Sequence, residues 1–178
     1  MYTHLQALLL AEDTNPQLKA EIKEVLAKLN TIRSLTDSFV KIARQKNIPL
    51  YYNTELGVDA DIFGWLPSAT VSSVAFPKGT WTPVDTTKGT TEKEMLKTAQ
   101  KMCLSQAVQS FTAELEAGTF DVLSTYRIIF LEETDAQGNS LKLLCGRCSG
   151  GELDLYVDRV NPDAWWDDAG FAWLATNA

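Results

Sequence analysis

The first third of the chain carries apolar residues at alternating steps of four and three, the spacing of a helix with one apolar seam. Asn15 before Pro16 is typical of a helix start, because asparagine caps the first turn and proline fits within it. The Asn47-Ile48-Pro49 segment ends the pattern, since proline disfavours helix in its predecessor. We predict a long helix from residue 16 to this segment and a short one over 2–12.

This seam has two interpretations, which the sequence leaves open. It either packs against the body of the same chain, as most amphipathic helices do, or pairs with a second copy in a coiled coil. The second interpretation makes the seam an oligomerisation surface and the chain a homodimer. The surface would consist of Leu18, Ile22, Val25, Leu29, Ile32 and Phe39.

Strand and helix patterns alternate after residue 47. Two strands are predicted over 48–53 and 69–76, separated by a glycine-containing loop and followed by a second connection over 78–90. A capping box at Thr91 and Glu94 opens a second long helix, which Gly118 ends. Strands over 122–134, 141–148 and 152–160, joined by glycine-containing turns, predict an antiparallel meander. Asn161-Pro162-Asp163 then predicts a short C-terminal helix through Trp166.

This order predicts an α+β fold with a mainly antiparallel five-stranded sheet. Residues 1–47 form a helical arm and residues 48–178 the α+β domain. In topology alone the order resembles the PAS, profilin and roadblock group of folds. Several members of that group dimerise through an N-terminal helix, so the resemblance implies the same use of this arm.

Acidic residues are concentrated in the last third of the chain. The 178 residues carry a net charge of −7, and residues 114–178 contain twelve acidic but four basic side chains. This charge argues against direct binding to nucleic acid or to an anionic membrane, which both need clustered Lys and Arg. The chain contains a single histidine, His4, which argues against acid–base catalysis or metal binding by histidine. With three cysteines, no secretory signal and no transmembrane stretch, we expect a cytoplasmic protein.

Few residue patterns suggest catalysis or metal binding. Cys145 and Cys148 have the spacing of a redox or half-zinc motif, but they end a strand instead of opening a helix, so we interpret them as the end of a hairpin. Asp59 and Asp61 are too few for a cation site and are interpreted as an acidic loop. We predict no catalytic residue, metal or cofactor, and the sequence leans away from an enzyme.

The alternation along residues 152–158 predicts an acidic outer face. Leu153, Leu155 and Val157 should point inward, which leaves the residues between them on the surface beside a tryptophan-rich tail. Tryptophan and tyrosine surrounded by charge are typical of interface anchors, although such rings also cap cores. The candidate partner-binding residues are Asp154, Tyr156, Asp158, Trp165, Trp166, Asp167 and Asp168.

The leading hypothesis is therefore a non-enzymatic protein-binding or assembly module whose partner has a basic surface. A first alternative is a small-molecule sensor with a pocket between the second long helix and the sheet. That pocket would lie near Tyr51, Tyr52, Met102 and Phe111. A second alternative is an acidic nucleic-acid mimic that inhibits a DNA-binding protein.

Overall fold

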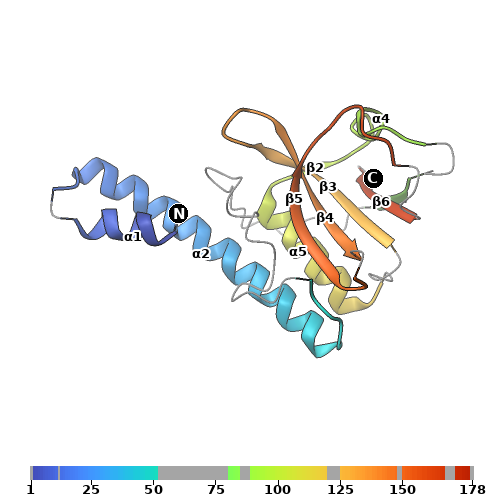
Figure 1. Cartoon of the computed structure of the whole chain (residues 1–178), viewed down its shortest axis with the longest axis horizontal. Coiled ribbons are helices and arrows are strands. Elements are labelled where there is room, and N and C mark those ends of the chain that lie inside the picture. The colour runs from blue at the N-terminus through green and yellow to red at the C-terminus, as the bar shows by residue number, and fades with distance from the viewer. Residues whose placement is uncertain are drawn as a thin grey trace.

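The predicted N-terminal helices are present in the computed structural model of the chain as α1, Tyr2–Leu10, and α2, Pro16–Gln45. The structure describes all residues except 1, 12, 52–79, 85–88, 120–124, 148–149, 167–170 and 177–178. Oδ1 of Asn15 accepts a hydrogen bond from the backbone N–H of Gln17 at 2.8 Å, which confirms the predicted cap. Helix α1 lies alongside the first half of α2, and together they extend away from the sheet as an arm (Figure 1).

The seam of α2 is covered to different degrees along its length. Its second half packs against α5, Leu104–Ala117, which places Ile32 and Phe39 in the main hydrophobic core. In the arm, Ile22 and Leu29 are also buried within the single chain. Val25 is partly buried and Leu18 remains 44% exposed. Packing within the chain therefore accounts for most of the seam, and pairing with a second copy stays a prediction.

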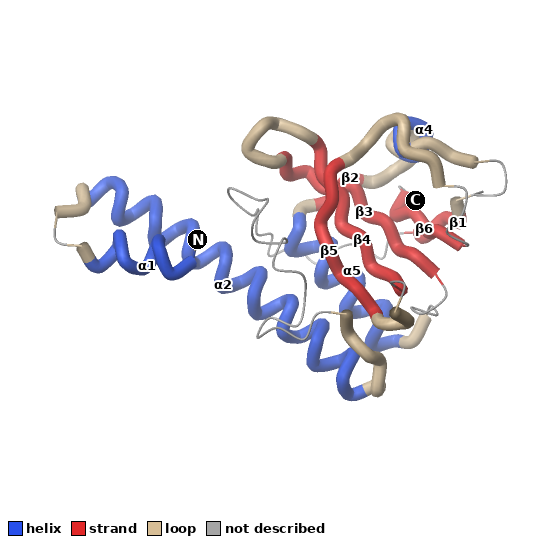
Figure 2. The backbone as a smooth tube through the Cα atoms, viewed as in Figure 1, coloured by secondary structure: helices blue, strands red, loops and turns tan. Residues whose placement is uncertain are grey.

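The strands form one sheet (Figure 2), in which three strand pairings are antiparallel and two are parallel. The predicted meander is present as β3, Thr125–Thr134, β4, Ser140–Arg147, and β5, Leu153–Arg159. Beyond β3 lie β6, Phe171–Thr176, and then β1, Thr80–Pro83, giving the order β1-β6-β3-β4-β5. Because β6 and the short β2, Lys101–Met102, both run parallel to β3, the expected five-stranded antiparallel sheet is wrong in detail.

The strands that complete the described part of this sheet come from segments that were not expected to supply them. In the predicted strand over 48–53, Leu50 forms an isolated bridge with Leu153, while residues 69–76 lie outside the described residues. The far edge is occupied by β1, from a segment interpreted as a connection, and by β6, from the tail. Both contain the β-branched and aromatic residues that suit strands, but neither shows a long alternation.

The second long helix is broken into α4, Glu92–Met95, and α5. The capping box at Thr91 and Glu94 is confirmed, but it opens a helix of four residues. Between the helices, the backbone N–H of Gln100 donates to the carbonyl of Ala175, and β2 pairs with β3. These remote partners satisfy backbone groups that a continuous helix would have used, so the helical spacing alone was misleading.

The short C-terminal helix is also absent from the described residues. The backbone N–H of Glu92 donates to the carbonyl of Ala164, and that of Trp166 donates to the carbonyl of Thr90. Trp165 forms an isolated antiparallel bridge with Thr91. The backbone N–H of Ala164 donates to the carbonyl of Asn161 in a turn, and residues 164–166 then run along the start of α4.

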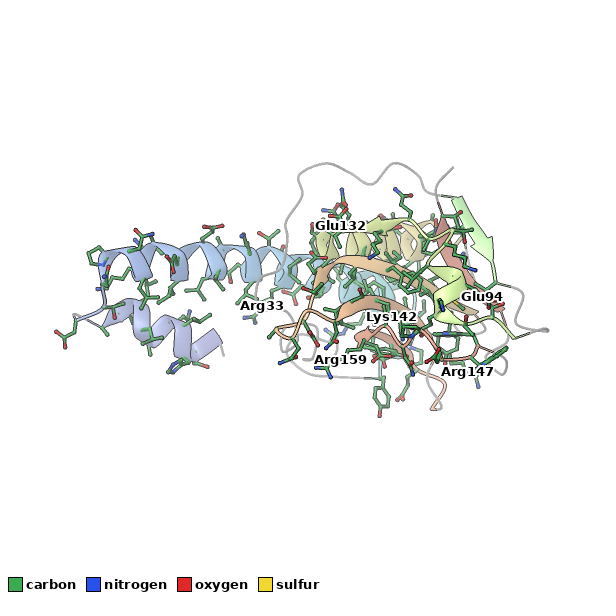
Figure 3. All side chains as sticks on the ribbon, turned by 90° about the horizontal axis from the view of Figure 1, so that it is seen from above. Arg33, Glu94, Glu132, Lys142, Arg147 and Arg159 are labelled. Atoms are coloured by element: carbon green, nitrogen blue, oxygen red, sulfur yellow. The ribbon has the colours of Figure 1, made fainter. Side chains whose placement is uncertain are left out.

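Both faces of the sheet are covered, which determines where the site lies. On one face, α2 and α5 pack over the main core. On the other, a second apolar cluster joins Met95 of α4 to Ile128, Phe130 and Leu144 of the central strands. In Figure 3, Lys142 lies on this second side, away from α2.

No helix among the described residues combines the length and the apolar character needed to cross a membrane.

Candidate functional site

Strand β5 carries the predicted alternation. Leu153, Leu155 and Val157 are buried in the main core, and Asp154, Tyr156 and Asp158 occupy the opposite face of the sheet. The prediction of an open acidic ladder is wrong, however, because these three side chains are only partly exposed. Tyr156 packs against the second cluster, since α4 and the 160–166 segment cover much of this face.

A pocket of about 340 Å³ opens on this second face. It brings together the first residue of α4, strands β4 and β5, and the segment that follows β5. Four of the predicted partner-binding residues line it: Tyr156, Asp158, Trp165 and Trp166. Asp167 and Asp168 lie outside the described residues. The remaining lining residues are Glu92, Lys142, Leu144, Asn161 and Ala164, and we call the whole the Trp165 pocket.

A buried ion pair forms the floor of the Trp165 pocket. Lys142 Nζ lies 2.6 Å from Glu92 Oε1, and the two side chains are 4% and 1% exposed. The same Nζ lies 3.1 Å from Asp158 Oδ2 and donates to the carbonyl of Arg159 at 2.9 Å. The ammonium thus donates to Glu92 and to the carbonyl of Arg159, and the carboxylate of Asp158 lies within ion-pair distance. Lys142 is therefore held as a structural cation.

Glu92 joins three parts of the chain. Its Oε1 accepts a second hydrogen bond from the indole Nε1 of Trp166 at 3.0 Å. Its Oε2 accepts from the backbone N–H of Asn161 at 2.8 Å. One carboxylate thus fixes the start of α4, strand β4 and the 161–166 segment relative to one another.

Sequence reasoning missed Glu92 and Lys142. Lys142 stands between Leu141 and Leu143, so alternation predicts a solvent-facing lysine. Glu92 stands in the first turn of a capped helix, where an exposed acidic residue is common. The available signal was weak: a lone lysine in the middle strand of a meander has to find a partner if that face is covered.

Trp165 is both exposed and fixed. Its side chain is 63% exposed at the rim of the pocket, while its backbone pairs with Thr91. The ring lies against Gly89, where an added Cβ would approach Trp165 Cε3 to 2.5 Å. Gly89 also has a positive φ of 67°, which favours glycine. The indole is therefore presented to solvent in one defined position.

Trp166 points the other way. It packs with the second cluster and makes an edge-to-face contact with Tyr126, with ring centroids 6.4 Å apart. Together with its bond to Glu92, this contact makes Trp166 mainly a structural part of the pocket wall, whereas Trp165 is available to a partner.

The charged residues that line the pocket are two carboxylates, Glu92 and Asp158, and one ammonium, Lys142. Burial, followed by the charges of neighbours that include Asp154, Asp158 and Glu92, raises the pKa of Tyr156 to about 12. The phenol therefore stays neutral at physiological pH. The same carboxylates that oppose a phenolate favour a cation at this place.

The other candidate residues do not join this site. Burial raises the pKa of the Cys145 thiol, which keeps the group protonated and unreactive. Cys148, Asp59, Asp61 and Tyr52 lie outside the described residues, so their interpretations stay predictions. Met102 and Phe111, expected beside a ligand pocket, are packed in the main core. Within the described part of the chain, no group of three or more His, Cys, Asp or Glu residues could hold a metal ion.

Comparisons of the chain with protein-family profiles, curated proteins and solved structures found no match. No activity, substrate or partner is therefore carried over to this chain from a relative.

Proposed function

We propose that this chain is a non-enzymatic protein-binding module that recognises a partner with a basic surface at the Trp165 pocket. The observation that carries the proposal is the position of Trp165, whose ring is 63% exposed and yet fixed against Gly89. An apolar ring of this size costs free energy when it is left in water, and a partner that covers it recovers that energy.

The physics of interfaces supports this assignment. Tryptophan is enriched among residues that carry most of the binding energy, particularly where the ring enters a desolvated contact. A ring that is already held in place loses little conformational entropy on binding. The acidic charge of residues 114–178 would in addition steer a basic partner towards this end of the molecule.

The same contacts argue against catalysis in this pocket. Lys142 is buried in an ion pair with Glu92 and a hydrogen bond to the carbonyl of Arg159, so its nitrogen is not presented to a substrate as a nucleophile. Tyr156, with a pKa of about 12, is a poor base at neutral pH. The pocket is suited to holding a group and not to transforming it.

Affinity capture from the source cells tests the proposal, followed by binding measurements with the purified partner. We expect Trp165→Ala to weaken binding by about 30-fold, mainly through faster dissociation, because an anchor tryptophan contributes about 2 kcal/mol. Tyr51→Ala is the matched control, since Tyr51 is also an exposed ring, 47%, but does not line the pocket. Equal effects of the two changes on every recovered partner would refute the proposal.

A second candidate is self-association through the arm. Leu10 is 82% exposed and Leu18 44% exposed, and both lie on the helices that extend away from the sheet. We propose that a second copy covers them. Leu18→Asp should then lower the molar mass measured by light scattering, whereas Ser34→Asp, at an exposed polar position of α2, should not. A monomeric wild-type chain across the accessible concentrations would exclude this candidate.

A further inference from the structure

The charges around the Trp165 pocket do not cancel. Lys142 is paired most closely with Glu92, at 2.6 Å, which leaves Asp158 as the surplus charge of the three. The Asp158 side chain is 45% exposed and so faces the opening. Asp154 stands four residues earlier on the same face of β5, and its charge contributes to the raised pKa of Tyr156.

The cation next to Asp158 in the sequence is bonded to residues outside the pocket. Arg159 follows Asp158, but its Nε donates to Asp135 Oδ2 at 2.7 Å and its Nη2 donates to Gln137 Oε1 at 3.1 Å. Its side chain is thus directed towards the turn between β3 and β4. The pocket therefore offers the carboxylate of Asp158 beside the fixed indole of Trp165.

We propose that the Trp165 pocket receives the guanidinium of an arginine side chain of the partner, an inference that rests on the proposed function. The planar guanidinium stacks on the exposed face of Trp165 and directs its N–H donors to the carboxylate of Asp158. The neutral phenol of Tyr156 and the indole of Trp166 complete the wall without adding positive charge.

The contacts favour arginine over lysine. The floor of the pocket offers three acceptors to a compact ammonium, and the ammonium of Lys142 already occupies that place. What remains at the rim is a flat ring and one partly used carboxylate, whose Oδ1 accepts from the backbone N–H of Arg159 and whose Oδ2 lies 3.1 Å from Lys142 Nζ. A planar cation that stacks and donates from its edge suits this arrangement better than a strongly hydrated point charge.

An NMR titration of the full-length chain tests this. Three amidated pentapeptides serve as probes, each with two glycines on either side of a central arginine, lysine or citrulline, and the indole N–H signals of Trp165 and Trp166 are followed. We expect saturable shifts with the arginine peptide, with a Kd on the order of 1 mM for so small a ligand. The lysine peptide should bind several-fold more weakly, and citrulline, which keeps the shape but lacks the charge, at least about tenfold more weakly.

Variants locate the binding. Asp158→Asn and Trp165→Ala should each reduce the affinity for the arginine peptide by at least about tenfold, with backbone signals that remain dispersed. Asp163→Asn removes an exposed acidic residue that does not line the pocket, and it should leave the affinity unchanged. Trp165→Phe, which keeps a smaller ring, should retain part of the affinity even if Trp165→Ala perturbs the fold.

The outcomes separate this inference from the proposed function. No saturable shift, or equal affinity for the citrulline peptide, overturns the arginine assignment. If Trp165→Ala still weakens a natural partner in that case, the proposed function survives. If the arginine peptide binds as expected but Trp165→Ala leaves every partner unaffected, the proposed function fails and the pocket is an arginine site of another purpose.

Discussion

Glu92 is the residue on which the geometry of the pocket depends most. Its two oxygens accept hydrogen bonds from Lys142 of β4 and from Asn161 and Trp166 of the 161–166 segment. Burying such a pair adds little net stability, because each charge first loses its hydration. Removing one partner is costly, since the other charge then stays buried without full compensation.

We therefore expect Glu92→Gln to lower the free energy of unfolding by about 3 kcal/mol, as measured by urea denaturation. Lys93→Gln changes an exposed neighbour and should stay within about 0.5 kcal/mol of the wild type. Adding Lys142→Met to Glu92→Gln should recover part of the loss, because the unpaired ammonium is removed. A double variant less stable than the single one would contradict this account.

Asp135 gives the turn between β3 and β4 a pH dependence. Hydrogen bonds, chiefly from the side chain of Asn139, lower its pKa from 3.8 to about 2. A folded-state pKa below the unfolded value means that the carboxylate stabilises the fold above about pH 4 and loses this contribution as the pH falls through about 2. Asp135→Asn should be less stable than the wild type at pH 7, and the difference should narrow by pH 2. A difference independent of pH, in urea titrations at both values, would show that the charge is irrelevant.

At the scale of elements, the features that are specified by adjacent residues could be predicted from the sequence. The cap at Asn15, the capping box at Thr91 and the meander of β3 to β5 are all present. Lengths and endings were not predictable where a distant segment supplies the hydrogen bonds. Gln100 donates to Ala175, seventy-five positions away, and no local pattern reports such a partner.

The start of α5 shows the same dependence on a distant residue. Both carboxylate oxygens of Glu133, on β3, accept from the backbone N–H of Leu104, at 2.9 and 3.1 Å. A buried negative charge at a helix N-terminus is stabilising by up to about 2 kcal/mol. Glu133→Gln keeps an acceptor but loses the charge, so we expect a loss of about 1 kcal/mol in urea denaturation. Glu132→Gln, at the exposed neighbour, should change little; an equal loss in both would point to net charge instead.

At the scale of the molecule, sequence reasoning identified some of the residues that line the pocket but missed the buried ion pair at its floor. Tyr156, Asp158, Trp165 and Trp166 were found because period-two alternation and clustered tryptophans are local signals. Glu92 and Lys142 are fifty positions apart and meet only because α4 crosses the second face of the sheet. The charge map therefore indicated the region in which the pocket lies. The covering of both faces of the sheet, which makes this region a pocket, depends on the tertiary arrangement.

Helix α2 belongs both to the arm and to the body of the molecule (Figure 1). We expect the two parts to differ in stability, because different sets of side chains bury the two halves of this helix. Phe39 is packed in the main core, so Phe39→Ala should cost about 3–5 kcal/mol and lower the melting temperature of the whole chain by about 6–20 °C. Ile22 is buried in the arm, where α1 is the neighbouring helix. Ile22→Ala should therefore accelerate hydrogen exchange in α1 and the first turns of α2, while the amides of β3 and β4 keep their protection. Faster exchange throughout the sheet in Ile22→Ala would show instead that arm and body unfold as one unit.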